Sequence, residues 1–350
     1  MTGTPPLHRR RTSPALRRRR RALGAGAGAM LALAVVAAAM VSGPSTSHPA
    51  LSRTAARGPG TTSSTAVTTA PPTTTRPAGP PYAVADSSII FTDPSRPTPA
   101  RGSVPAHPGR TLRTIVRRPV GAPGPLPLVV FVHGWNSEPE YYEPLLDTWA
   151  AAGYLVVAPE FPGSAQNLPG TPVSDYAAQA LDVSFVITQV LGGVLGPVDP
   201  NRIVAAGHSD GGTTTAILAL APQYQDPRIK AYLSLAGQIP PDVSAPWGAS
   251  RTPGVLLVAV GTDDEYGNEA LSTQLYDTAQ MTKAFINVPG GSHLGPFVSA
   301  TPMADSVRAA TVAFMNLVLA DPGHVTAGQL LQALAAPAGS SAYQVSAADN

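Results

Sequence analysis

The sequence contains no cysteine among its 350 residues. This absence excludes disulfide bonds, a thiolate nucleophile and a cysteine-rich zinc site, and it removes the cysteine that a lipid-modified export signal needs. If the chain is exported, its hydrophobic core alone has to stabilise it, so we expect a well-packed fold.

Charged residues are also scarce, at 13% of the chain, whereas 43% of the residues are hydrophobic, which indicates a compact globular body. The net charge is only +2, but the basic and acidic residues are distributed unevenly along the sequence. Eight of the 23 basic residues are arginines in the first 21 positions, where no acidic residue occurs, and the other 15 stand against 21 acidic residues. The basicity therefore belongs to a leader, and we expect no nucleic-acid partner.

Residues 22–41 form an uncharged, apolar segment that directly follows a run of five arginines. This order of a basic and an apolar region is typical of a signal peptide, yet the 20 residues are also long enough to span a bilayer. Basic residues stay on the cytoplasmic side in either case. We therefore expect a secreted or extracytoplasmic protein whose leader, residues 1–41, is either removed or retained as a membrane anchor.

Residues 42–81 consist almost entirely of Ser, Thr, Pro, Gly and Ala. Such a stretch buries too little apolar surface to offset the entropy lost on ordering, so it predicts a disordered linker. From residue 82 onward the pattern changes, and one domain is expected over residues 82–320. The remainder, residues 321–350, is expected to be a C-terminal tail with a weak helix.

Short β-rich runs alternate with helical ones along residues 82–320, which predicts an α/β fold with a mostly parallel sheet that helices cover on both faces. The expected strands are residues 88–92, 111–117, 126–133, 154–158, 202–206, 229–235, 255–260 and 284–288. The expected helices are residues 139–152, 174–190, 211–221, 269–280 and 303–319.

The sharpest chemical signal is the motif Gly207-His208-Ser209-Asp210-Gly211, which fits G-x-S-x-G. A predicted strand precedes the motif and a predicted helix follows it, as a serine on a strained strand-to-helix turn requires. The glycines leave room for the turn, and the turn exposes the serine hydroxyl at the carboxyl end of the sheet. The motif therefore predicts Ser209 as a nucleophile.

A serine hydroxyl is a weak nucleophile, so it needs a histidine base that a carboxylate orients. On this type of turn the acid and then the histidine follow the serine along the chain. Two histidines remain after Ser209: His293, in a glycine-rich loop after a strand, and His324, beyond the last expected helix. We expect His293 to be the base.

The acid is expected after the predicted strand 255–260, which leads into the sequence GTDDE. Asp264 is the first choice, because it stands three residues after the glycine, where many hydrolases place their acid. Asp263 is the alternative acid, and Glu265 is a third candidate. An aspartate that is not used here would be a turn residue that bonds its own backbone.

An oxyanion hole needs two backbone N–H donors. One donor follows the nucleophile and belongs to Asp210. The other is expected in the loop HGWN after the predicted strand 126–133, where Trp135 is the candidate, and its side chain is also expected to contact the substrate. His133 and His208 are expected to be structural.

Together, the segments HGW, GHSDGG, GTDD and GGSH resemble the α/β-hydrolase superfamily over most of residues 82–320. Within it, the loop DPSRPTP, the run EPEYYEPLLDTWAAAGYLVVAPEFPGS and the helix DVSFVITQVL are similar to bacterial dienelactone-hydrolase-like, chlorophyllase-like and platelet-activating-factor-acetylhydrolase-like esterases. The resemblance implies an α/β-hydrolase fold and serine esterase chemistry, with no metal ion and no organic cofactor.

The segments APW (residues 245–247) and GGSH (residues 290–293) also resemble cutinase-like polyester hydrolases. In that group the tryptophan lines a substrate subsite, so the resemblance implies that Trp247 contacts the substrate. The segment between the predicted strands 229–235 and 255–260 is short, which predicts an open site without a large lid, accessible to bulky or polymeric esters.

These features predict an exported, monomeric serine hydrolase that cleaves small-molecule or polymeric carboxylic esters through an acyl-enzyme, with Ser209, His293 and Asp264 as its triad. A serine peptidase or an acyltransferase on the same fold is an alternative, which peptide substrates or added alcohols would distinguish. A catalytically inactive, envelope-tethered binding protein is another alternative, and its Ser209 would not react with a fluorophosphonate probe.

Overall fold

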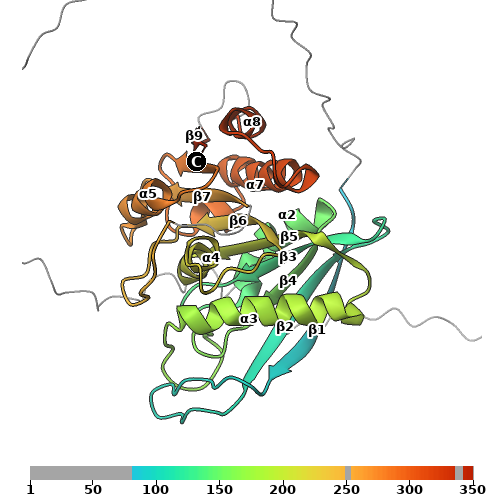
Figure 1. Cartoon of the computed structure of the whole chain (residues 1–350), viewed down its shortest axis with the longest axis vertical. Coiled ribbons are helices and arrows are strands. Elements are labelled where there is room, and N and C mark those ends of the chain that lie inside the picture. Colours follow the sequence, from blue (N-terminus) through green and yellow to red (C-terminus); the bar gives the residue numbers. More distant parts are fainter. Residues whose placement is uncertain (1–80, 249–253, 336–341, 350) are drawn as a thin grey trace, which may run out of the picture. The chain divides into compact units, whose positions relative to one another are not determined.

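The structure is a computed structural model that describes residues 81–248, 254–335 and 342–349 (Figure 1). The apolar segment 22–41 and nearly all of the linker 42–81 lie outside the described residues, so the expectations for both stay predictions.

The described strands form one nine-stranded sheet with the order β1-β2-β4-β3-β5-β6-β7-β8-β9. They are β1 (Val84–Asp93), β2 (Arg110–Pro119), β3 (Leu126–Val132), β4 (Leu155–Pro159), β5 (Val198–His208), β6 (Ile229–Leu235), β7 (Val255–Gly261), β8 (Lys283–Val288) and β9 (Gln344–Ala348). All neighbours from β4 to β8 pair in parallel, whereas the pairings at the two edges are antiparallel. The carboxyl ends of the central strands therefore meet at one edge of the sheet.

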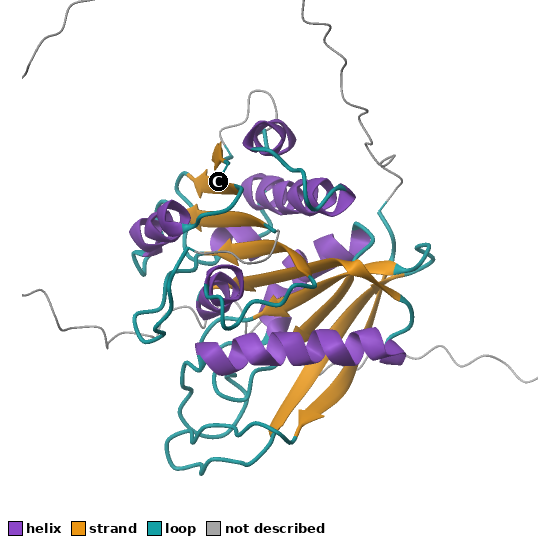
Figure 2. Cartoon of the chain, viewed as in Figure 1, coloured by secondary structure: helices purple, strands orange, loops and turns teal. Residues whose placement is uncertain are grey.

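Helices cover both faces of this sheet, as Figure 2 shows. One hydrophobic core contains residues of α2 (Glu143–Ala151), α6 (Gly295–Val298), α7 (Pro302–Ala320) and α8 (Ala327–Ala333). The other contains residues of α3 (Tyr176–Gln189), α4 (Asp210–Leu220) and α5 (Asn268–Thr278). Short helical turns, η1 (Pro139–Tyr142) and η2 (Val190–Val194), precede α2 and follow α3. Every residue of β3, β4 and β7 is buried, as expected for strands with both faces covered. The expected α/β architecture is confirmed.

Two helical stretches of the described chain, Tyr176–Val194 and Pro302–Ala320, are long and apolar enough to cross a membrane by length and composition alone. Both pack on the sheet instead: Val183 and Val186 of the first stretch are fully buried, as are Phe314 and Met315 of the second. Their apolar character is accounted for by these contacts with the core.

The C-terminal segment differs from the expected tail, because it belongs to the domain. β9 pairs antiparallel with β8 and closes that edge of the sheet. Leu330 of α8, Leu334 and Tyr343 are buried in the same hydrophobic core as residues of α7. The described residues after 320 therefore extend the domain beyond the expected boundary, because a seven-residue helix and a five-residue strand leave only a weak pattern in the sequence.

Candidate active site

The serine of the G-x-S-x-G motif lies on the turn between β5 and α4. Ser209 has φ 59° and ψ −121°. Residues other than glycine rarely adopt a positive φ of this kind. A Cβ on Gly207 would collide with the carbonyl group of Gly211, and a Cβ on Gly211 would collide with that of Val132. The tight turn thus depends on both glycines, and it holds Ser209 at the positive end of α4, where developing negative charge is stabilised.

A histidine and an aspartate come together beside this turn. Nδ1 of His293, in the loop after β8, lies 2.7 Å from Oδ2 of Asp264, which follows β7. The Asp264 side chain is fully buried. Burial would raise the pKa of Asp264, but the hydrogen bond and charge of His293 and the amides of Tyr266 and Asn268 outweigh it and lower that pKa. The carboxylate therefore stays charged and can orient the imidazole.

The other two acids of this turn occupy different positions. Asp263 is exposed, and its Oδ1 accepts a hydrogen bond of 3.1 Å from Thr262. Glu265 accepts a hydrogen bond of 2.9 Å from the backbone N–H of His293. Among the three candidates for the acid, only Asp264 contacts the imidazole of His293 in the described chain, whereas Glu265 holds the loop that carries it.

His208, the residue before Ser209, contacts His293. The rings of His208 and His293 have centroids 4.5 Å apart, and Nε2 of His208 lies 2.9 Å from the backbone oxygen of His293. No hydrogen bond joins the Ser209 hydroxyl to His293 among the described residues. Catalytic hydrogen bonds are often long without substrate and tighten only when substrate binds, so the lack of a Ser209–His293 hydrogen bond is compatible with proton transfer.

The loop after β3 passes next to the serine. A Cβ on Gly134 would lie 3.3 Å from Cβ of Ser209. The next residue, Trp135, has 44% of its surface exposed, and its backbone N–H has no acceptor within the described chain. The same holds for the N–H of Asp210, at the first position of α4, where intrahelical acceptors are lacking. Two unused amides therefore flank Ser209.

His133 braces this loop and cannot serve as a base. Its Nε2 accepts a hydrogen bond of 3.0 Å from the N–H of Phe161, and its Nδ1 lies 2.8 Å from the oxygen of Gly134. Burial lowers the pKa of His133 to about 4, so the ring is neutral at neutral pH. Both ring nitrogens are used internally, which leaves neither free to accept a substrate proton.

The buried Arg101 holds the segment against which the Trp135 loop packs. Its guanidinium donates within 3.1 Å to five backbone oxygens, those of Pro162, Gly163, Ala165, Leu168 and Pro169. The same segment accepts a hydrogen bond of 2.8 Å from the N–H of Asn136 to the oxygen of Ser164. Arg101 is 3% exposed, and its five donors match such a curved set of carbonyl groups.

The Asp210 side chain contacts the start of α3. Its carboxylate accepts hydrogen bonds of 2.6 Å from Ser174 and 3.2 Å from Tyr176, at the start of α3. Burial raises the pKa of Asp210, and the nearby charge of Asp242 adds to this effect. No ion pair involves Asp210 among the described residues, so the hydroxyl groups of Ser174 and Tyr176 hold its carboxyl group.

A hollow of about 410 Å³ lies between the segment after β6 and helix α5. It is lined by Gln238, Ile239, Val243, Trp247, Leu271, Gln274 and two prolines. Two links tie it to the serine and the imidazole. The N–H of Gln238 donates to the hydroxyl of Thr213, which in turn donates over 3.3 Å to the backbone carbonyl oxygen of Ser209. Asn268, one turn before Leu271 on α5, lies 3.2 Å from Nδ1 of His293.

Three residues of this region carried no recognisable signal in the sequence. The hydroxyl of Tyr142 contacts His208, 66 positions away, and the guanidinium of Arg101 donates to carbonyl groups more than 60 positions away. Tyr266 is 65% exposed, and its ring stands edge-on to His293 with centroids 4.7 Å apart. A pattern of neighbouring residues cannot reveal such long-range pairs, although the position of Tyr266 beside the GTDD segment is a usable hint.

Residues 101–257 match the model of the family described as Chlorophyllase. The match begins at Arg101 and includes the Trp135 loop, the Ser209 turn and Trp247. It ends within β7, before Asp264 and His293. No curated protein matches the chain.

Proposed function

Because the chain is an α/β-hydrolase that resembles the chlorophyllase family over residues 101–257, a similarity that implies an ester hydrolase, we propose that it hydrolyses carboxylic esters through an acyl-enzyme on Ser209. The observation that carries the proposal is the hydrogen-bonded pair Asp264–His293 beside a serine held at positive φ. A nucleophile, a base and an orienting carboxylate are the three groups that acyl transfer to a serine requires.

The proposed reaction proceeds in two steps. The Ser209 oxygen attacks the ester carbonyl carbon while Nε2 of His293 accepts the hydroxyl proton, and the C–O bond to the alcohol then breaks as His293 returns that proton to the leaving oxygen. Water attacks the acyl-enzyme with His293 again as base, which releases the acid and restores Ser209. Asp264 keeps the imidazole oriented and stabilises its protonated form.

The backbone amides of Trp135 and Asp210 are proposed to stabilise the oxyanion. Both lie beside Ser209, and neither has another acceptor among the described residues. Preorganised donors of this kind lower the barrier because they need no reorientation as charge develops on the carbonyl oxygen.

The hollow next to the site is proposed to bind part of the ester, with Trp247 as a contact. Its lining side chains carry no charge and combine apolar groups with the amides of two glutamines, so the hollow suits a neutral group that has polar atoms. Trp135 is proposed to contact the substrate from the oxyanion loop. No helix covers the site in the described part of the segment after β6, which supports access for bulky esters.

We further propose that the enzyme works outside the cytoplasm, because an apolar segment and a Thr- and Pro-rich linker precede the domain. We also propose that it acts as a monomer. Amino-terminal sequencing of the exported protein distinguishes a removed leader from a retained anchor.

The proposal is tested by replacing Ser209 with Ala and measuring hydrolysis of p-nitrophenyl butyrate. Turnover by the wild type and its loss in Ser209→Ala is the expected result. Equal turnover by the two proteins contradicts the proposal.

A further inference from the structure

A chain of hydrogen bonds crosses the floor of the candidate site. The N–H of Gly134 lies 3.2 Å from the hydroxyl oxygen of Tyr142, which lies 3.0 Å from Nδ1 of His208. Nε2 of His208 lies 2.9 Å from the backbone oxygen of His293. Tyr142 and His208 are each only 2% exposed, so water cannot replace these partners.

The donor and the acceptor of each hydrogen bond in this series can be assigned. The carbonyl of His293 can only accept, so Nε2 of His208 carries a hydrogen and donates it. A neutral His208 then has a lone pair on Nδ1, which accepts the Tyr142 hydroxyl proton. The Tyr142 oxygen in turn accepts from the N–H of Gly134. Each polar atom in this series of hydrogen bonds therefore has a partner, and every hydrogen bond is donated in the same direction, from Gly134 toward His293.

The charge states agree with this direction. Burial lowers the pKa of His208 to about 3, so its ring stays neutral at neutral pH. Burial also raises the pKa of Tyr142 to about 12, so its hydroxyl keeps its proton. His208 therefore has no proton to exchange with a substrate.

The two ends of the chain belong to different parts of the catalytic apparatus. Gly134 precedes Trp135, the proposed oxyanion donor, and His293 is the proposed base. Between them, His208 immediately precedes Ser209. Rings also contact along the chain, with His208 and Tyr142 centroids 5.5 Å apart and His208 and Phe297 centroids 5.3 Å apart.

We propose that Tyr142 and His208 are positioning residues that couple the oxyanion loop to the loop of the general base, so that both are held in register with Ser209. The inference rests on the proposed function. A shift of either loop by a fraction of an ångström would misplace a donor or the base, and such shifts slow catalysis more than they weaken substrate binding.

The direct test is Tyr142→Phe, which removes the hydroxyl and keeps the ring. The matched control is Tyr154→Phe, because Tyr154 is also only 2% exposed and its hydroxyl donates over 2.7 Å to Asn316, away from the site. With p-nitrophenyl butyrate, Tyr142→Phe is expected to lower kcat roughly ten- to a hundredfold with little change in KM. Equal kcat values for the two variants would overturn the inference.

A second variant tests whether the two residues act as one unit. His208→Gln can still donate to the carbonyl of His293 but offers no acceptor at the position of Nδ1. Since both substitutions break the same link, the double variant should lose about as much kcat as the more impaired single variant. Losses that multiply would mean that Tyr142 and His208 act separately.

Nitrogen NMR shifts of the ¹⁵N-labelled full chain test the coupling without any turnover. The expected spectrum has a protonated Nε2 and a bare, hydrogen-bonded Nδ1 for His208, assigned by its loss in His208→Gln, and the His293 signals should move in Tyr142→Phe. A protonated Nδ1 would overturn the inference. Wild-type protein that shows this tautomer but hydrolyses no ester would instead refute the proposed function.

Discussion

Nδ1 of His293 lies 2.7 Å from Oδ2 of Asp264, although 29 residues separate them and each follows a different strand of the sheet. The contact exists because β7 and β8 are parallel neighbours whose carboxyl ends lie side by side. Their loops therefore bring a carboxylate and an imidazole to the edge of the sheet where the Ser209 turn also lies.

The first prediction concerns the acid. Asp264→Asn should lower kcat on the order of a thousandfold or more, because an amide neither selects the imidazole tautomer nor stabilises the imidazolium. Asp263→Asn is the matched control and should leave kcat unchanged, since Asp263 is exposed and contacts Thr262. Steady-state hydrolysis of p-nitrophenyl butyrate checks both variants. The reverse pattern would assign the acid to Asp263.

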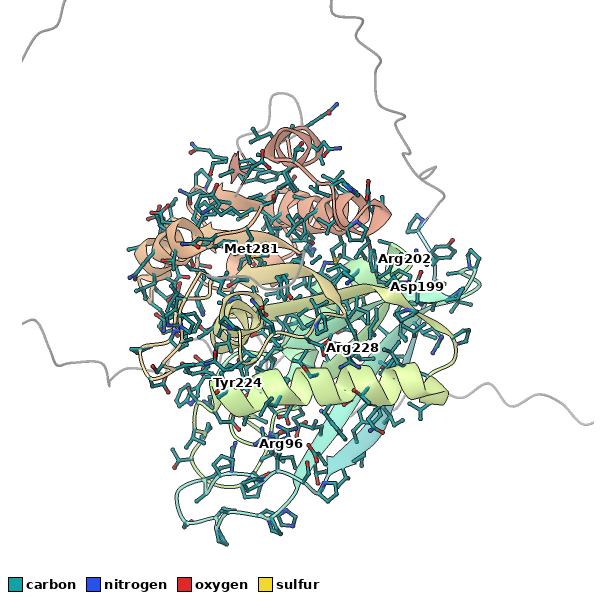
Figure 3. All side chains as sticks on the ribbon, viewed as in Figure 1. Arg96, Asp199, Arg202, Tyr224, Arg228 and Met281 are labelled. Atoms are coloured by element: carbon teal, nitrogen blue, oxygen red, sulfur yellow. The ribbon has the colours of Figure 1, made fainter. Side chains whose placement is uncertain are left out.

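The second prediction concerns the support of the oxyanion loop. Arg101→Lys should lower kcat about tenfold, because three ammonium donors cannot satisfy five backbone oxygens and the segment beneath the Asn136 contact loosens. Arg228→Lys is the control. Arg228 bonds Asp226 and the Ser184 carbonyl of α3 and is labelled in Figure 3.

The affinity of a trifluoromethyl ketone inhibitor checks this prediction, since the inhibitor mimics the oxyanion. It should weaken in Arg101→Lys in parallel with kcat. An Arg101→Lys protein that binds the inhibitor as tightly as Arg228→Lys does would show that Arg101 has no part in positioning the loop.

The third prediction concerns the hollow. Trp247→Ala should raise KM on the order of tenfold for esters whose acyl or alcohol group is long enough to reach it, because apolar contact is lost. An acetate ester of a small alcohol should be unaffected and serves as the control substrate. A series of p-nitrophenyl esters of increasing chain length checks this, and a uniform change across the series would place the substrate elsewhere.

The fourth prediction concerns pH and stability. The pKa values of His133 and His208 fall from 6.5 to about 4 and about 3 because both rings are buried. Below pH 6.5 the unfolded chain binds protons at these histidines that the folded chain does not bind. The free energy of unfolding should therefore decrease as the pH falls from 6.5 to 4, by about 1.4 kcal/mol per pH unit for each histidine.

Urea unfolding between pH 7 and pH 4.5 measures this slope. His208→Gln removes one of the two groups, so its slope should be smaller than that of the wild type by about 1.4 kcal/mol per pH unit. Parallel slopes for the two proteins would mean that His208 does not resist protonation in the fold.

Local signals were sufficient for the elements around Ser209, because G-x-S-x-G lies between a strand and a helix that are themselves recognisable. The choice among Asp264, Asp263 and Glu265 was harder. All three lie in one turn, and only the direction in which that turn sends each side chain decides which one contacts His293.

Features that depend on distant contacts were missed. Tyr142 looked like one of several apolar residues in a helix, and nothing near it in the sequence points to His208, 66 residues away. Arg101 lay in a polar loop with no hint of its carbonyl partners. The tail after residue 320 was misjudged for a related reason, since β9 is defined by its pairing with β8 and not by its own composition.

The proposed mechanism requires Ser209 to carry the acyl group during turnover. The most direct measurement is mass spectrometry of the intact protein quenched in acid during hydrolysis of a slowly deacylating p-nitrophenyl ester, followed by peptide mapping. We expect a mass increase equal to the acyl group on the peptide that contains Ser209, and no increase in Ser209→Ala. Turnover without any acylated Ser209, or an acyl group on another residue, would refute an acyl-enzyme on Ser209.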